Sequence, residues 1–470
     1  MTPIAATIAL LSATLAVAGV MVVYFWPRDQ GLALRRIVIV VYAVVYPVSG
    51  LAHVLGFSVH RGFYEASAGA VVTDRSGLVA AALCSLVGLI ALVLGLLAVP
   101  NRGRHADVEH EVKRASPRHS LVASHPVAAL VAGAALSAVS VFALLKVRTV
   151  VAALDGARVI AVDGGMARFA SLAQWLPWGC AIAALALLVR RPRRLGEVWN
   201  AVLMVLVIGA GYLSTSWSGG RTDIILIGLP VLLVFLPYLP SIRIPLLAVG
   251  AVVGFWFIRT ETLSRAGVDD FNVWDLLDWQ FGRFSMVAFA ERYVADHGLI
   301  GGETLLTGYL TVPSAILHLL RIPNEVPTLS VVQVTGSAFL GTDESIFIVP
   351  GMTAELFLNF GYAGVVVGYV ILGLVVAVLA NLALSTRGEM GRLLVGYLAG
   401  VSLVHSVNAQ SGAALPIIVF GGFPLFLLTA LEFADARRHQ RWHSRASNRV
   451  GAEARTPSRP AMGATLAQER

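Results

Sequence analysis

Residues 350–368 read PGMTAELFLNFGYAGVVVG, and they join a long polar segment to a new hydrophobic span. The polar segment extends from Arg259 to Phe360 and is the one long polar excursion in a chain otherwise made of apolar stretches. It holds several arginines, the adjacent acids Asp343 and Glu344, and Glu355 directly before the span. A pure scaffold has little use for such a loop, so the sequence points to chemistry there.

Composition excludes a water-soluble domain. Hydrophobic residues make up 57% of the 470 residues and charged residues only 13%, which leaves more apolar surface than one globular core can bury. Crossing a bilayer as a helix takes about 17–25 apolar residues. About eleven such stretches are expected, at 4–26, 37–59, 78–99, 127–147, 171–189, 198–214, 223–239, 244–258, 361–381, 393–407 and 413–433.

The sequence therefore predicts an all-α polytopic membrane protein with about eleven transmembrane helices and one long extracytoplasmic loop containing short amphipathic helices. Transmembrane helices 1–8 occupy residues 1–258, the loop occupies 259–360, and helices 9–11 occupy 361–434. Residues 435–470 have too few large apolar side chains to fold and are expected to form a disordered, basic cytoplasmic tail.

Basic residues predict the orientation, because loops rich in Lys and Arg stay in the cytoplasm. With the N-terminus outside and the C-terminus inside, about two thirds of the 35 Lys and Arg residues fall on the inner side. The first hydrophobic stretch lacks the basic leading region of a cleavable signal peptide, so it is expected to be a retained helix.

The net charge of +8 indicates contact with anionic lipid headgroups. No folded basic domain accompanies this charge, so nucleic acid is not an expected partner. The chain has only two cysteines, both in expected spans, and neither a disulfide framework nor a metal site is expected. No nucleotide-binding or metal-binding motif is present, and we expect no cofactor.

One helix is expected in the loop, over residues 273–297. Asn272 is placed to cap it with Asp275 in the first turn, and His297 followed by glycine suits its end. At 100° per residue, Arg283 falls in the apolar stripe, whereas Arg292 lies on the polar side with Asp296 four residues on. Arg283 is therefore predicted to bind an anion at a protein contact, the alternative being an interfacial helix whose arginine reaches the lipid headgroups.

Two further arginines are candidates for binding an anion. Arg221 follows two glycines in SWSGGRTD and precedes a predicted helix, an arrangement that suits a phosphate. Arg259 lies at the outer end of the eighth expected span. The alternative for both is an ordinary interfacial arginine paired with a nearby acid, Asp223 or Glu261.

Three residues are candidates for a general base. Glu355 lies among apolar residues on a stretch expected along the outer interface, which Gly361 is expected to end as the next membrane helix begins. Glu355 also suits the first turn of a helix. Asp343 lies beside Glu344, where the two acids either activate a hydroxyl, bind a divalent ion or form an exposed turn. His318 lies on a short helix expected to open at Pro313 and end before Pro323, and it is either a base or a packed residue.

The stretch from Gly308 to Gly373 resembles the O-antigen polymerase, or oligosaccharide repeat-unit polymerase, family. The likeness rests on GYLTVPSAILHLLRIP, on the Gly-, Thr- and Ser-rich residues up to Pro350, and on AELFLNFGYAGVVVGYVILG. The segment SGGRTDIILI with Arg221 is similar to the arginine that this family has at the start of a mid-chain helix. About a third of the chain is covered.

The resemblance implies a glycosyltransferase of the bacterial cytoplasmic membrane that joins polyprenyl-diphosphate-linked oligosaccharides on the outer face, with a flippase and a chain-length regulator as further partners. Arg221 and Arg283 would then bind the diphosphate with Arg259 in support, and no metal is needed. Glu355 would be the leading base, with Asp343 and His318 as weaker candidates.

Other functions stay open. A lipid-linked oligosaccharide flippase or other transporter explains the spans equally well, although it does not need the long loop and no internal repeat is visible. A ligase or another membrane glycosyltransferase on the same architecture is the closest competing function.

Overall fold

The computed structural model describes residues 2–26, 33–57, 75–100, 126–153, 175–188, 194–215, 282–320, 350–386, 388–408 and 417–453, with a few isolated residues between them. Over these residues the fold is helical and has no strand, which confirms an all-α protein. The expected spans 223–239 and 244–258 lie almost entirely outside this set.

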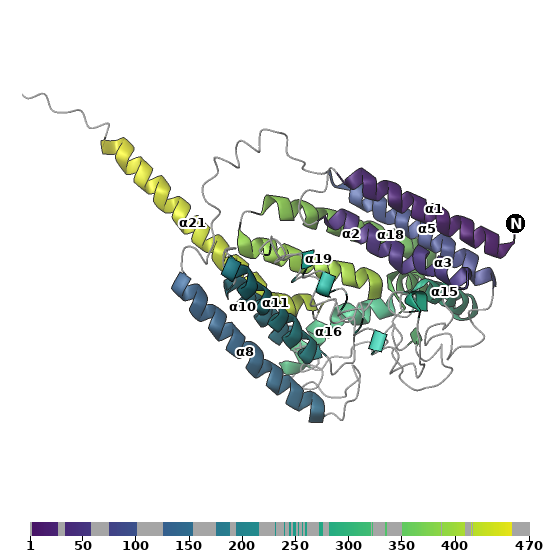
Figure 1. Cartoon of the computed structure of the whole chain (residues 1–470), viewed down its shortest axis with the longest axis horizontal. Helices are drawn as coiled ribbons and strands as arrows, with labels where there is room; N and C mark the ends of the chain where they lie inside the picture. The colour runs from purple at the N-terminus through teal and green to yellow at the C-terminus, as the bar shows by residue number, and fades with distance from the viewer. Residues whose placement is uncertain are drawn as a thin grey trace, which may run out of the picture.

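A first bundle of helices surrounds one hydrophobic core (Figure 1). Its helices are α1 (Pro3–Phe25), α2 (Leu34–Ala43), the π-helix η1 (Val44–Val48), α3 (Ser49–Val54), α5 (Arg75–Ala98), α15 (Phe284–His297) and α18 (Met352–Ser385). Helix α16 (Glu303–Leu319) packs against α18.

A second group of helices surrounds a separate core. Its members are α8 (Pro126–Ala153), α10 (Trp175–Leu188), α11 (Arg194–Thr215), α19 (Glu389–Asn408), the π-helix η4 (Ile417–Gly421) and α21 (Gly422–Glu453). Helix α19 lies between the two groups and contributes residues to both cores. Helix α21 extends far beyond the rest of the protein in Figure 1.

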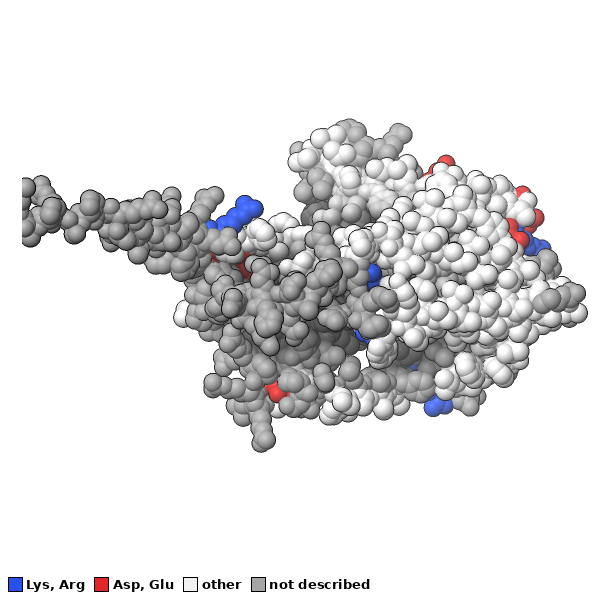
Figure 2. Space-filling model, turned by 90° about the horizontal axis from the view of Figure 1, so that it is seen from above, with Lys and Arg blue, Asp and Glu red and all other residues white. Residues whose placement is uncertain are grey.

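Within the described part of the chain, five helical stretches are long and apolar enough to cross a membrane, namely Pro3–Phe25, Leu34–Val54, Gly77–Ala98, Met352–Ala383 and Ile417–Arg438. On the face shown in Figure 2, charged side chains are sparse among the described residues, as expected for a surface in contact with lipid. The protein is therefore built as a membrane protein, and the number of eleven spans stays a prediction.

Helices α2, α5 and α18 are joined at one end of the first bundle by Arg35, which is buried. Its Nη2 donates to the carbonyl of Val99 at 3.4 Å and to Oδ1 of Asn381 at 3.3 Å. Asn381 in turn donates to the carbonyl of Pro100 at 3.0 Å. The start of α2 and the ends of α5 and α18 therefore share one end, and α15 lies at the other end of the bundle (Figure 1).

Helix α18 is not straight. Gly361 has φ 61° and ψ −149°, and it divides α18 into a half-helix, Met352–Phe360, and a span arm, Tyr362–Ser385. The two parts fold back on each other: the hydroxyls of Thr353 and Tyr369 are 2.8 Å apart, although 16 residues of straight helix would separate them by about 24 Å. Only the span arm is therefore available to cross the membrane.

The half-helix is buried inside the bundle from Gly351 to Asn359. Its Leu356 side chain lies so close to Gly368 that a Cβ there would come within 2.4 Å of it. The break at Gly361 confirms the prediction that this glycine ends the stretch, but the expected position along the outer interface is wrong. The apolar residues of the stretch are buried by protein, except Phe360, which is 45% exposed.

Three expected helix boundaries are wrong. The helix expected over 273–297 is interrupted, because Gly282 and Arg283 are not helical and α15 begins at Phe284. Pro313 lies inside α16, which begins ten residues earlier at Glu303, and does not open a new helix. Residues 435–453 of the tail that was expected to be disordered are helical, because α21 continues to Glu453. Residues 454–470 lie outside the described part.

Candidate functional site

Arg283 is a buried arginine, only 5% exposed, at the residue that precedes α15. Its backbone N–H donates to the carbonyl of Val45 in η1 at 3.3 Å, and its Nη1 donates to the carbonyl of Gly282 at 3.1 Å. Its Nε has no hydrogen-bond partner among the residues that the structure describes. A buried guanidinium with an unused donor is costly, so the site calls for an acceptor that the described residues do not supply.

The start of the half-helix lies against this arginine. A Cβ on Gly351, the residue that precedes Met352, would come within 2.9 Å of both Cβ and Cγ of Arg283. The φ of Gly351 is 82°, in the left-handed region that favours glycine. Glycine is therefore required at this position both by its backbone and by the aliphatic part of Arg283 packed upon it.

Backbone donors are also available at this end of the half-helix. The N–H of Thr353 donates to the hydroxyl of Tyr46 at 3.2 Å. The N–H groups of Met352 and Ala354 donate to no acceptor among the described residues. They belong to the first turn, whose N–H groups have no partner within the helix and carry the positive end of its dipole.

The positive charge of Arg283 at this helix end lacks a compensating anion among the described residues. A buried guanidinium at the positive end of a helix is disfavoured by desolvation and by the helix dipole together. An anion between Arg283 and the first turn of the half-helix would relieve both effects, and helix N-termini are common binding sites for phosphate. The geometry therefore defines a candidate anion site.

Glu355 lies on the same half-helix, one turn from Gly351, and is 1% exposed. Its N–H donates to the carbonyl of Gly351 at 3.0 Å, as expected for the first turn of a helix. Its charge is felt by Tyr309 of α16, whose pKa is raised first by burial and then by Glu355. The carboxylate of Glu355 and the phenol of Tyr309 are thus close enough to interact electrostatically.

The other end of the half-helix is held by hydrogen bonds from Asn359 and from residues 300–304. The side-chain N–H₂ of Asn359 donates to Thr304 Oγ1 and to the carbonyl of Glu355, both at 2.7 Å, and its Oδ1 accepts from Gly302 N–H at 3.0 Å. Two more N–H groups, of Ile300 and Gly301, donate to the carbonyls of Leu358 and Asn359 at 2.9 and 3.1 Å. The sequence GLIGGET at 298–304 thus supplies the partners that this helix end needs.

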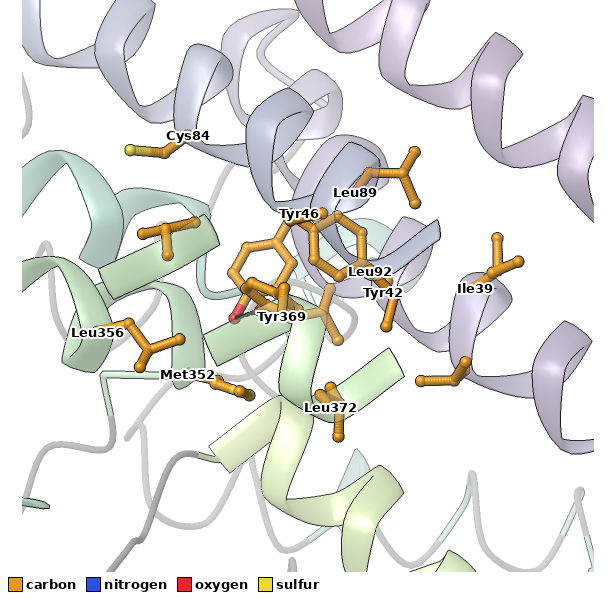
Figure 3. Packing of buried hydrophobic residues seen from close by; sticks show 14 of the residues in the cluster. Ile39, Tyr42, Tyr46, Cys84, Leu89, Leu92, Met352, Leu356, Tyr369 and Leu372 are labelled. Carbon is orange, nitrogen blue, oxygen red and sulfur yellow. Dashed lines mark hydrogen bonds between the residues drawn. The ribbon is translucent and has the colours of Figure 1, made fainter. Parts of the chain in front are cut away.

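Two buried tyrosines, Tyr46 and Tyr369, hold the start of the half-helix, and the ring of a third, Tyr42, packs on theirs (Figure 3). Tyr369 donates to the hydroxyl of Tyr46 at 3.3 Å, and the ring of Tyr42 lies 4.8 Å from that of Tyr46 and 5.1 Å from that of Tyr369. Tyr46 lies in η1, where Pro47 has no N–H to donate and the helix widens to a π-helix. The π-helix therefore presents both Val45 and Tyr46 to the candidate site.

Of the six residues predicted from the sequence, the structure brings Arg283 and Glu355 to one place. Arg259 is exposed. The side chain of His318 lies outside the described part, although its backbone belongs to α16. Arg221 and Asp343 lie outside the described residues, so the structure says nothing about their roles.

The predicted difference in burial between Arg283 and Arg292 is confirmed. Arg292 is exposed and its Nε lies 3.9 Å from Asp296 Oδ2, four residues on. The predicted cap is also present, because Asn272 and Asp275 exchange hydrogen bonds of 2.8 and 3.1 Å between side chain and backbone. Burial of Arg283 has a different origin from the predicted one, since this residue precedes α15 instead of lying inside a helix.

Sequence reasoning missed Gly351, Tyr46 and Asn359. The available signals were Pro350-Gly351 before the half-helix, and Pro47 inside an apolar span, where it disturbs helical hydrogen bonding.

Within the described ranges, no group of three or more His, Cys, Asp and Glu residues could hold a metal ion. No protein-family model matches the chain, and no curated protein or solved structure is similar to it. The resemblance to the O-antigen polymerase family therefore rests on the sequence motifs alone.

Proposed function

We propose that this protein is a glycan polymerase that joins polyprenyl-diphosphate-linked oligosaccharide repeat units on the outer face of a bacterial cytoplasmic membrane. The observation that carries the proposal is the buried Arg283, with its unused Nε, at the N-terminus of a half-helix that also bears Glu355. An anion binder and a carboxylate in one place suit the transfer of a group from a phosphate leaving group.

The reaction follows from these two parts. A hydroxyl of the acceptor sugar attacks the anomeric carbon of the donor, a new glycosidic bond forms, and the bond from that carbon to the diphosphate oxygen breaks. The leaving electron pair remains on the diphosphate, where Arg283 and the N–H groups of Met352 and Ala354 stabilise the added charge. The proton of the attacking hydroxyl passes to Glu355.

The spacing of these parts agrees with such a transfer. Glu355 is four residues from Gly351, which corresponds to about 6 Å along the helix axis. This separation leaves room for an anomeric carbon between the leaving oxygen and the attacking hydroxyl. Arg221, in the short connection before the expected span 223–239, remains a proposed contributor, as do Arg259, Asp343 and His318 of the long loop.

The orientation is part of the proposal. Arg35 and Arg36 lie at the start of α2, at the end of the bundle shared with the end of α18, and basic residues favour the cytoplasmic side. The turn at Gly361 and helix α15 then lie at the outer end, with the N-terminus outside and the C-terminus inside. This places the half-helix in the outer part of the membrane.

A lipid-linked oligosaccharide flippase is the second candidate, and one observation favours it. Interrupted helices whose N-termini point at an anionic substrate group are typical of transporters. A flippase binds the diphosphate but breaks no bond, so it has no need of Glu355 as a base.

Deletion of the gene separates the two functions. Loss of a polymerase leaves single lipid-linked repeat units on the outer face of the membrane, whereas loss of a flippase leaves them on the inner face. The purified protein in liposomes, supplied only with the lipid-linked repeat unit, should form polymer. If the units accumulate inside and no polymer forms in the liposomes, the protein is not a polymerase.

A further inference from the structure

The hydroxyl of Tyr46 is buried, and no described group accepts a hydrogen bond from it. The oxygen accepts two hydrogen bonds, from the N–H of Thr353 at 3.2 Å and from the hydroxyl of Tyr369 at 3.3 Å. A phenol oxygen has two acceptor positions and one proton, so both acceptor positions are used and the proton is left. Tyr46 is 0% exposed, and water from the surface does not reach it.

This donor lies at the same end of the half-helix as the unused donor of Arg283. Tyr46 contacts the first turn of the half-helix through Thr353, and the neighbouring carbonyl of Val45 accepts the backbone N–H of Arg283. In Figure 3, Tyr46 and Tyr369 lie beside Met352, the first residue of the half-helix. Two buried side-chain donors and the N–H groups of Met352 and Ala354 therefore meet at one helix end.

The site is deep. Thr353 lies level with Tyr369, which is eight residues, or about 12 Å of helix, from the turn at Gly361. At that depth a bound anion is cut off from bulk water, so each of its oxygens must receive its hydrogen bonds from the protein. An arginine and two backbone N–H groups do not satisfy the several acceptor oxygens of a phosphate.

We propose that Tyr46 is a phosphate-binding residue that donates its hydroxyl proton to an oxygen of the anion held by Arg283 and the half-helix. This inference rests on the proposed function in naming a diphosphate as the natural ligand. The π-helix then contributes to the site in two ways. Its widened turn at Pro47 positions Tyr46 against the half-helix, and the carbonyl of Val45 accepts the backbone N–H of Arg283. The residue is a ligand contact in addition to an anchor for Thr353.

Binding of inorganic pyrophosphate to the purified full-length protein tests the inference. Tyr46→Phe should weaken binding by about tenfold or more, the loss expected for a hydrogen bond to a charged group. Tyr42→Phe is the matched control, because its hydroxyl belongs to the same ring cluster but donates to the carbonyl of Ser85 at 2.7 Å. It should bind pyrophosphate within about twofold of the unmodified protein, since it leaves every donor to the anion in place.

Tyr46→Phe also removes the acceptor of Thr353 N–H, so a second measurement separates anchoring from binding. A fluorinated tyrosine at position 46 is a stronger hydrogen-bond donor and a weaker acceptor than tyrosine. If Tyr46 donates to the anion, pyrophosphate affinity rises; if Tyr46 only anchors the half-helix, affinity falls or stays unchanged.

The outcomes also distinguish this inference from the proposed function. Equal affinities in Tyr46→Phe and Tyr42→Phe, no gain with the fluorinated residue, or no pyrophosphate binding by the unmodified protein would overturn the role of Tyr46. Pyrophosphate binding with the predicted pattern in a protein that forms no polymer would support Tyr46 as a binding residue and contradict the polymerase.

Discussion

The two ends of the half-helix differ in how their polar groups are satisfied. At the end near Gly361, the carbonyls of Glu355, Leu358 and Asn359 accept hydrogen bonds from Asn359 and from the turn at 300–301. At the other end, Arg283 Nε and the N–H groups of Met352 and Ala354 have no acceptor among the described residues. The first end is thus an anchor, and the second has the unused donors of a ligand site.

The largest effect is expected from the carboxylate between the two ends. Glu355→Gln removes the proton acceptor but keeps the shape of the side chain, and polymer formation should fall by about 10²–10⁴-fold, as for loss of a general base. Polymer yield from purified protein and lipid-linked repeat units measures this. Pyrophosphate affinity should be nearly unchanged; full activity of Glu355→Gln would assign the base to another residue, Asp343 or His318.

The next largest effect is expected from Arg283, at the end of the half-helix that has unused donors. Arg283→Ala should lower polymer formation by about 30- to 1,000-fold, because the charge that develops on the diphosphate loses about 2–4 kcal/mol of stabilisation. Arg283→Lys should recover little, since an ammonium does not bridge two phosphate oxygens as a guanidinium does. Polymer length on a gel, at matched protein level in the membrane, is the measurement.

Arg292→Ala is the matched control for this experiment. Its ion pair with Asp296 is exposed and is worth a few tenths of a kcal/mol at most, so this variant should polymerise normally. An equal loss in Arg283→Ala and Arg292→Ala would show that burial of Arg283 has no bearing on function.

Substitution of Gly351 tests whether its contact with Arg283 positions the guanidinium. Gly351→Ala places a methyl group within 2.9 Å of Arg283 and strains a backbone with φ 82°, whereas Gly298→Ala meets open space at φ 83°. Both should lose about 1–3 kcal/mol of unfolding free energy from backbone strain. Only Gly351→Ala should also displace Arg283, which we expect to lower pyrophosphate affinity by about tenfold, equivalent to 1.4 kcal/mol.

These two variants are compared by thermal unfolding in detergent and by calorimetric titration. If both bind pyrophosphate like the unmodified protein, the contact of Arg283 with Gly351 does not position the guanidinium.

The anchored end should show the smallest effect on binding. Asn359→Ala leaves Gly302 N–H without its acceptor in a packed turn, and we expect a loss of about 2–3 kcal/mol in stability. The folded fraction should still bind pyrophosphate within about threefold, because the donors at the other end are untouched. Loss of binding at full stability would contradict the separation of the two ends.

Much of the fold was predictable because it depends on local apolar patterns. The apolar face of α15 was correctly predicted from its period, and Met286 and Ala290 are both 0% exposed. The break at Gly361 was also predicted. The folding back of the half-helix was not, because MTAELFLNF has the same apolar pattern whether it continues a helix or packs against it.

The candidate site was predicted only in part. Arg283 and Glu355 were identified because charged groups among apolar residues are unusual. Tyr46 could not be identified in this way, since a tyrosine in a span is ordinary, and its role follows from a π-helix and from a partner 307 residues away. Long-range contacts of this kind leave no periodic signal in one sequence.

Calorimetric titration of pyrophosphate into the purified protein is the most direct test of the candidate anion site. We expect saturable binding that weakens by at least about tenfold in Arg283→Ala, as expected for loss of a buried charged donor, and is unchanged in Arg292→Ala. Equal binding by the two variants, or no binding by the unmodified protein, would contradict the claim that the N-terminal end of the half-helix holds a phosphate.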